Sequence, residues 1–189
     1  MIESSNGYRL RPLQHSDEGF VYEALRDFPI HRMSLEQVRR EMSNLLYLTD
    51  GFDVADRGQR GVCLVLELAG NPLGLRLSKF NRNGMWAEIA LLAMHPDARG
   101  AGHQSAEGFM HGWWYFDQLN LNGCWFEAVD TAPVNGAASK WRGKREDTET
   151  SRPSVWDGQT LRRLQIRPKA YRELLAEHPT WSSVSIALS

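Results

Sequence analysis

Residues 85–106 constrain the fold of this chain more than any other stretch. An apolar run at residues 89–94 breaks at residues 95–96, and a glycine-containing loop at residues 99–102 then leads into a helical pattern. This order predicts a buried strand, a tight loop and the start of a helix. The first N–H groups of a helix have no partner within it, and the helix dipole adds partial positive charge there. The stretch therefore predicts an anion site, for which a phosphate-bearing ligand is the natural occupant.

The segments before this stretch predict one strand and two helices. Residues 8–13 alternate between polar and apolar side chains, as in a half-buried strand. Ser16 stands where it would cap a first helix, and Ser34 with Gln37 has the spacing of a capping box for a second.

The middle of the chain predicts a sheet. Gly-Asn and Asn-Gly turns separate three runs that we expect to be antiparallel strands, at residues 62–68, 73–80 and 85–94. A helical pattern follows at residues 105–119, and a strand pattern at residues 124–129. Strand, helix and strand in this order predict a right-handed crossover that makes the two strands parallel.

The last part of the chain predicts a short helix and a closing hairpin. Residues 132–141 have a helical pattern, and an Asp-Gly turn separates strands expected at 150–156 and 160–166. Pro168 is expected to begin a final helix. The apolar tail 181–189 is either a last strand or a docking segment.

Size and cysteine content limit the class of protein. The chain has 189 residues, 42% of them hydrophobic, which suits one well-filled core. Cys63 and Cys124 lie in strand-like apolar runs, so we expect no disulfide. The sequence opens on no signal-like segment and has no membrane-length apolar run, so we expect a cytoplasmic protein without membrane contact.

Charge is unevenly distributed along a chain whose net charge is −1. Residues 140–172 contain ten Lys and Arg against four acids, a local charge of +6. This segment is either the solvated face of a hairpin or a surface that attracts an anionic ligand or partner.

The predicted loop resembles a known signature. Arg99-Gly100-Ala101-Gly102 is similar to the Arg/Gln-x-x-Gly-x-Gly/Ala motif of the GNAT acetyltransferase superfamily, which wraps the pyrophosphate of acetyl-coenzyme A. Glycines let the backbone approach such a ligand closely, and successive N–H groups form a concave anion nest. Gln104 departs from the motif, since relatives carry glycine or alanine there. The order of predicted elements resembles the same superfamily over nearly the whole chain.

Two later stretches resemble the RimJ/RimL-type subgroup of this superfamily. Asn135 followed by Ser139 is similar to its Asn-x-x-Ser segment, with the serine one residue late, and residues 156–174 resemble its closing hairpin and terminal helix. The resemblance implies a single-domain α/β fold with a mixed, mostly antiparallel sheet, flanking helices and a parallel strand pair at the acetyl-CoA site. Residues 1–60 would shape the acceptor side, 61–130 the acetyl-CoA-binding core, and 131–189 the C-terminal hairpin and helix.

The resemblance also implies an activity, which is acetyl transfer from acetyl-CoA to a primary amine of a protein N-terminus, a lysine or a small molecule. The backbone N–H groups near Leu92 and Met94 would stabilise the oxyanion. Acetyl-CoA would be contacted by Leu92, Met94, Arg99, Gly100, Ala101, Gly102, His103, Gln104 and Asn135. Relatives protonate the leaving thiolate with a tyrosine that this chain lacks, and Ser139 is the nearest hydroxyl, unless it is only a surface or capping residue. Asn135 has a similar alternative, as the cap of the short helix.

Glu88 is the candidate general base. An amine is protonated near neutral pH, so a base must remove a proton before the nitrogen attacks the thioester. Glu88 begins the strand that leads to the glycine loop, 11 residues before Arg99, where many GNAT enzymes carry their catalytic glutamate. The alternative is an exposed glutamate at a strand end.

Two other functions stay open at this point. Gln104 and the missing tyrosine are also compatible with a non-catalytic acyl-CoA-binding protein. The basic segment is compatible with a GNAT-like enzyme that modifies an amine of a nucleotide or nucleic acid, whose binding would weaken steeply with salt. The six histidines show no metal-ligand spacing, so no metal is expected. A homodimer remains open as well.

Overall fold

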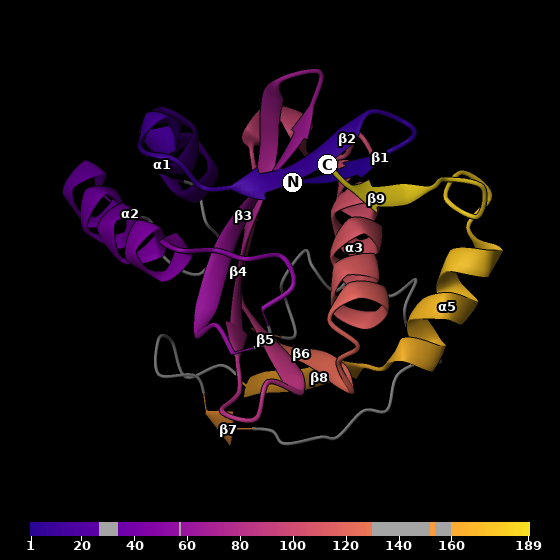
Figure 1. Ribbon diagram of the computed structural model, residues 1–189. Coiled ribbons are helices and arrows are strands. Elements are labelled where there is room, and N and C mark those ends of the chain that lie inside the picture. Colours follow the sequence, from indigo (N-terminus) through magenta and orange to yellow (C-terminus); the bar gives the residue numbers. More distant parts are fainter. Residues whose placement is uncertain (27–33, 57, 130–151, 154–159) are drawn as a thin grey trace.

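A mixed sheet of nine strands forms the frame of the described residues, in the order β7-β8-β6-β5-β4-β3-β2-β1-β9 (Figure 1). The computed structural model describes residues 1–26, 34–56, 58–129, 152–153 and 160–189. The strands are β1 (Ile2–Ser4), β2 (Tyr8–Pro12), β3 (Gly61–Leu68), β4 (Asn71–Phe80), β5 (Trp86–Met94), β6 (Gly123–Val129), β7 (Arg152–Pro153), β8 (Thr160–Ile166) and β9 (Ile186–Leu188). The helices are α1 (Glu18–Arg26), α2 (Leu35–Thr49), α3 (His103–Trp113) and α5 (Pro168–Glu177), with short helices η1 (His15–Asp17), η2 (Pro96–Ala98) and η3 (Trp114–Gln118).

The antiparallel meander is confirmed. β3 pairs with β4, and β4 with β5, both antiparallel, as the short turns between the runs predicted. Ala69 and Gly70 form the first turn with positive φ values of 52° and 80°. The strands expected at 8–13 and 160–166 also form, whereas most of the strand expected at 150–156 and the whole helix expected at 132–141 lie outside the described residues.

The expected cap at Ser16 is wrong, because Ser16 lies inside η1 and Gln14 precedes that helix as its cap. The physical reason is Asp17, whose carboxylate accepts hydrogen bonds from the Gln14 N–H at 2.8 Å and from two guanidinium nitrogens of Arg11 at 2.7 Å each. Arg11 also donates to Glu67 of β3 at 2.7 Å. This tie fixes the start of α1 to the sheet more firmly than a serine hydroxyl would.

The second capping box is confirmed. The Ser34 hydroxyl accepts a hydrogen bond from the Gln37 N–H, and the Gln37 side chain accepts one from the Ser34 N–H, at 3.2 Å and 2.7 Å. Two orphan donors at the start of α2 are satisfied in this way.

Helices cover both faces of the sheet. In Figure 1, α1 and α2 lie on one face, and α3 and α5 lie on the other. Val21, Leu25, Val38 and Leu45 of α1 and α2 are buried against Leu75 and other residues of β3 to β5. On the other face, residues of α3 and η3 form a second cluster with the sheet, with α5 and with the tail, which includes Phe109, Trp114, Tyr171 and Trp181.

The predicted parallel pairing of the two strands is confirmed, but it extends over a short length only. β5 and β6 are parallel, and their register joins Trp86, Ala87 and Glu88 to Gly123, Cys124 and Trp125. β5 then continues to Met94 without β6 beside it in the described register. The helix expected at 105–119 forms as α3, whose last turn widens into the π-helical η3.

The apolar tail fits both alternatives, because Trp181 is buried in the cluster around α3 and residues 186–188 form a strand. β9 pairs antiparallel with β1, and the Met1 ammonium donates to the Ser189 carbonyl at 2.8 Å, so the two ends of the chain lie together (Figure 1). The sequence pattern missed β1, which is only three residues long.

A buried polar network, which the sequence patterns did not predict, joins α3 and η3 to β4. Arg76 of β4 forms an ion pair with Glu107 of α3, and both side chains are almost completely buried. His111 Nδ1 lies 3.1 Å from the Glu107 carboxylate. The hydroxyls of Ser78 and Tyr115 share a hydrogen bond of 2.6 Å. Burial alone would raise the pKa of Glu107, but the charges of Arg76 and His111 hold it below its usual value.

Both cysteines are free and buried, as expected. Burial raises the pKa of Cys124 to about 12, and it raises the pKa of Cys63 as well. Since the thiolate is the reactive form, we predict that neither thiol reacts with an aromatic disulfide reagent in the folded protein. Both should react after denaturation, as followed by absorbance. Rapid labelling of the native protein would contradict the burial of these side chains.

Candidate active site

A bulge in β5 shapes the region where β5 and β6 separate. Leu77 of β4 pairs with Leu91, while the next residue, Ser78, pairs with Ile89, so Ala90 is an extra residue in β5. A bulge bends its strand and re-aims the side chains next to it. The bulge lies just beyond the last residue of β5 that pairs with β6, which is Glu88.

Beyond the bulge, β5 presents backbone donors to the open side. Opposed residues of an antiparallel pair alternate between those that exchange hydrogen bonds and those that do not. The His95 N–H donates to the Leu73 carbonyl at 2.8 Å, so the N–H groups of Leu92 and Met94 point away from β4. The Met94 carbonyl also points away from β4, since it accepts a hydrogen bond from the Arg99 side chain. The predicted oxyanion donors therefore lie along the edge that β6 leaves unpaired.

The glycine loop has the backbone that an anion nest requires. Gly100 and Gly102 have φ values of 78° and 84°, a region that side chains with a Cβ avoid. A Cβ placed on either glycine would meet no atom of the described residues within 4 Å. Gly102 is the N-terminal cap of α3 and has no side chain to bond the first-turn N–H groups. The Ser105 N–H donates to the Gly102 carbonyl at 3.0 Å, which leaves the N–H groups of the first two residues of α3 as the candidate anion donors at the positive end of the helix dipole.

The Arg99 side chain holds this loop to neighbouring parts of the protein. Its Nε donates to the Met94 carbonyl at 3.1 Å, and an Nη lies 3.5 Å from the carbonyl of Ala24 in α1. The guanidinium thus ties the loop to β5 and α1. The Arg99 side chain therefore bonds to backbone carbonyls of the protein itself.

His103 is held at the first turn of α3 by β2. Its Nδ1 lies 2.8 Å from the Tyr8 hydroxyl, and the two rings meet edge to face. Tyr8 also packs against Trp181, so the start of α3 is fixed to β2 and to the C-terminal tail. Gln104, the departure from the family motif, is half-buried in the same turn.

Glu88 lies on the sheet face opposite α3. Its chain neighbours Ala87 and Ile89 pack into the cluster around α3, and successive side chains of a strand alternate between faces. On its own face Glu88 stands between Lys79 of β4 and Trp125 of β6, and its side chain is half-buried. The structure thus brings Glu88 to the start of the separation of β5 and β6, and the glycine loop to the other end of β5.

Two predicted site residues, Asn135 and Ser139, lie outside the described residues. Their roles, as contact for acetyl-CoA and as proton donor, stay predictions.

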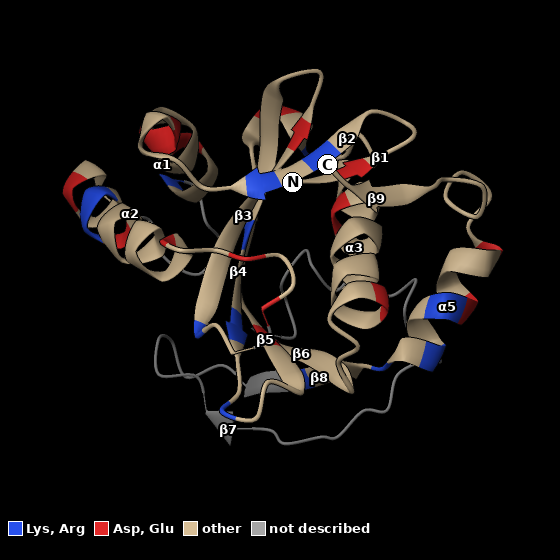
Figure 2. Cartoon of the chain, viewed as in Figure 1, with Lys and Arg blue, Asp and Glu red and all other residues tan. Residues whose placement is uncertain are grey.

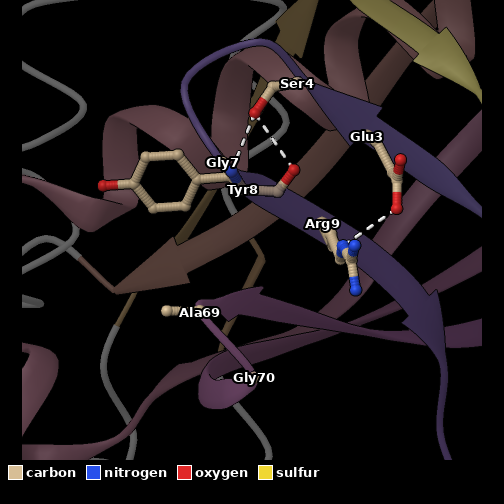
Figure 3. A pocket seen from close by; sticks show the side chains of 7 residues that line it. All are labelled: Glu3, Ser4, Gly7, Tyr8, Arg9, Ala69 and Gly70. Atoms are coloured by element: carbon tan, nitrogen blue, oxygen red, sulfur yellow. Dashed lines mark hydrogen bonds and ion pairs between the residues drawn. The ribbon is translucent and has the colours of Figure 1, made fainter.

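Two cavities lie elsewhere on the protein. One, of about 270 Å³, is lined by the β1–β2 turn and by Ala69 and Gly70 (Figure 3). Figure 3 shows the Glu3–Arg9 ion pair there and Ser4 hydrogen-bonded to the backbone of Tyr8. A wider groove of about 850 Å³ lies between η1 and α2. Neither is lined by a residue predicted for the acetyl-CoA site.

Charge on the described elements is mixed. Figure 2 shows both signs on α1, α2 and α5. Among the described residues no three His, Cys, Asp or Glu side chains are grouped as metal ligands. No helix in the described part of the chain is long and apolar enough to cross a membrane.

The fold is GNAT-like, and solved structures of N-acetyltransferases share it. A spermidine N-acetyltransferase SpeG from Vibrio cholerae, in complex with CoA and spermine, matches with a TM-score of 0.66 and 17% identity over 87% of this chain and 98% of its own. A chimera of SpeG and hSSAT matches with a TM-score of 0.68 and 17% identity over 87% and 98% of the two chains. SpeG from Vibrio cholerae in complex with manganese ions matches with a TM-score of 0.64 and 17% identity, over 88% of this chain and 96% of its own. No family model and no curated protein sequence matches the chain.

Proposed function

We propose that this protein transfers an acetyl group from acetyl-CoA to a primary amine. The observation that carries the proposal is the arrangement along β5. A carboxylate lies where β6 leaves the strand, N–H groups that point away from β4 follow it, and a loop with two positive-φ glycines precedes the start of α3 at its end. A similar fold holds CoA and spermine in a SpeG structure.

The site divides the chemistry between its two ends. The pyrophosphate would accept hydrogen bonds from the backbone of residues 100–104, while Arg99 holds the loop in place. The pantetheine arm would run along β5 and bond the N–H groups of Leu92 and Met94. These groups would also stabilise the oxyanion of the tetrahedral intermediate.

Glu88 would accept a proton from the amine, directly or through a water molecule. The neutral nitrogen then attacks the thioester carbon, forming a C–N bond. As the C–S bond breaks, the nitrogen, which now carries a positive charge, loses a second proton, and this proton replaces the one that the thiolate receives. The thiolate that leaves takes up a proton, for which Ser139 is the proposed donor.

The finer assignments remain proposals as well. Asn135 would contact the pantetheine, the three parts of the chain would have the roles given above, and the RimJ/RimL-type subgroup is supported by sequence motifs alone. An anionic partner at residues 140–172 and a homodimer are further proposals of this kind.

Coenzyme A binding tests the anion nest. We predict that Gly102→Val abolishes CoA binding in calorimetry, because valine disfavours a φ of 84° and its side chain would fill the space above the loop. Gly51→Val is the matched control, since Gly51 has a φ of 73° and equally open surroundings but follows α2 and is not part of the glycine loop. Retained affinity in Gly102→Val would show that the phosphate site lies elsewhere.

A further inference from the structure

The sequence Trp-x-Glu occurs on two adjacent parallel strands, as Trp86-Ala87-Glu88 in β5 and as Trp125-Phe126-Glu127 in β6. Glu88 is directly opposite Trp125. Residues opposite each other in a sheet lie on the same face, so Trp125 and Glu127 share the face of the candidate base.

β8 adds a cation to this face. Arg163 is opposite Glu127, and its guanidinium carbon lies 4.0 Å from the centroid of the Trp125 ring. One Nη of Arg163 is 3.0 Å from the Glu127 carboxylate, and the two side chains are 34% and 12% exposed. Arg163 is therefore both stacked on an indole and paired with a half-buried acid.

An indole face beside a carboxylate is the arrangement that binds an organic cation. One face of an indole ring binds one cation, and the Arg163 guanidinium already occupies a face of the Trp125 ring. Trp125 is on β6, the strand next to β5, and neighbouring strands are about 4.8 Å apart. The occupied face of the Trp125 ring is therefore one strand away from Glu88. A diamine whose reacting nitrogen is at Glu88 would bring its second ammonium close to Arg163 on one side or to Lys79 of β4 on the other.

We infer that Arg163 is a specificity-determining residue that excludes polycationic acceptors, and that this site selects amines without a second positive charge. The inference rests on the proposed acetyl transfer. It separates this chain from the SpeG structure that holds spermine, whose fold it shares. With Arg163 removed, the face of the Trp125 ring that its guanidinium covers would be open to the second ammonium.

The test compares 1-aminobutane with 1,4-diaminobutane, which differ by one amine on the same carbon chain. Free thiol release from acetyl-CoA gives kcat/KM for each. We expect the wild-type protein to prefer the monoamine by on the order of 10-fold, as like-charge repulsion and a filled cation site imply. Arg163→Gln should lower or reverse this preference, while Arg163→Lys, which keeps the charge, should preserve it.

Arg172→Gln is the matched control, because Arg172 is exposed and pairs with Asp117 on the α3 side of the protein. Circular dichroism and thermal unfolding check that each variant folds. A wild-type preference for the diamine, or an unchanged ratio in Arg163→Gln, overturns the inference.

Calorimetry of the two amines on the protein saturated with CoA provides a readout without turnover. The diamine should bind more tightly to Arg163→Gln than to the wild type. Equal diamine affinity in the two proteins overturns the inference alone, whereas a wild-type protein that does not bind CoA overturns the proposed function.

Discussion

Replacing Glu88 by glutamine is expected to lower kcat for acetyl transfer by roughly 10²–10⁴-fold, the usual contribution of a general base. Glutamine has nearly the same size, but its amide cannot accept the proton that the substrate ammonium must lose before the neutral amine attacks. Glu88 and Met94 are at opposite ends of β5, about 20 Å apart along the strand. Binding of acetyl-CoA at the glycine loop should therefore stay unchanged in calorimetry, and the loss should appear in kcat.

A matched control separates the base from a general charge effect. Glu173→Gln makes the same chemical change at an exposed α5 residue whose partner, Lys169, is 4.0 Å away, and it should leave kcat unaltered. If Glu88→Gln turns over at the wild-type rate, Glu88 is not the base, and the proposal of CoA binding without catalysis gains support.

Replacing Glu107 by leucine is expected to destabilise the fold by about 3–5 kcal/mol, because it leaves the buried Arg76 guanidinium without its counter-charge. The double variant Arg76→Met/Glu107→Leu should recover most of this loss, since it removes both charges together. Glu3→Gln breaks the ion pair with Arg9, whose side chains are 36% and 52% exposed, and should cost no more than about 1 kcal/mol. Urea unfolding measures all four proteins. A Glu107→Leu variant as stable as Glu3→Gln would show that the buried pair contributes little.

The same network predicts a loss of stability in acid. The pKa of Glu107 is held below its usual value, so its contribution is present above about pH 4.3 and is lost as the pH falls through the lowered value. Burial and the Arg76 charge lower the pKa of His111. Below about pH 6.5 the unfolded chain therefore binds a proton at His111 more readily than the folded protein does. Stability should therefore decrease from pH 7 to pH 5, and a His111→Gln variant should show a flatter dependence in thermal unfolding.

Much of the fold and one end of the site could be predicted from the sequence because they depend on local patterns. Strand alternation and turn residues define the meander from β3 to β5. Glycines at positions 100 and 102 predict positive φ values, and the helical pattern after them predicts the start of α3. The Ser34–Gln37 capping box is equally local. The expected cap at Ser16 is wrong because Arg11 of β2, which also bonds to Glu67 of β3, holds Asp17 in the turn instead.

The chain order of the sequence by itself determined a GNAT-like arrangement of strands and helices, and it placed a glutamate and a glycine loop at the two ends of one strand. Only the tertiary structure decided what lies around them. The bulge at Ala90, the burial of Arg76 against Glu107 and the stacking of Arg163 on Trp125 each depend on strand register or helix packing. Register and packing join residues that are separated along the chain, by 31 positions for Arg76 and Glu107, and no local pattern records which side chains will meet.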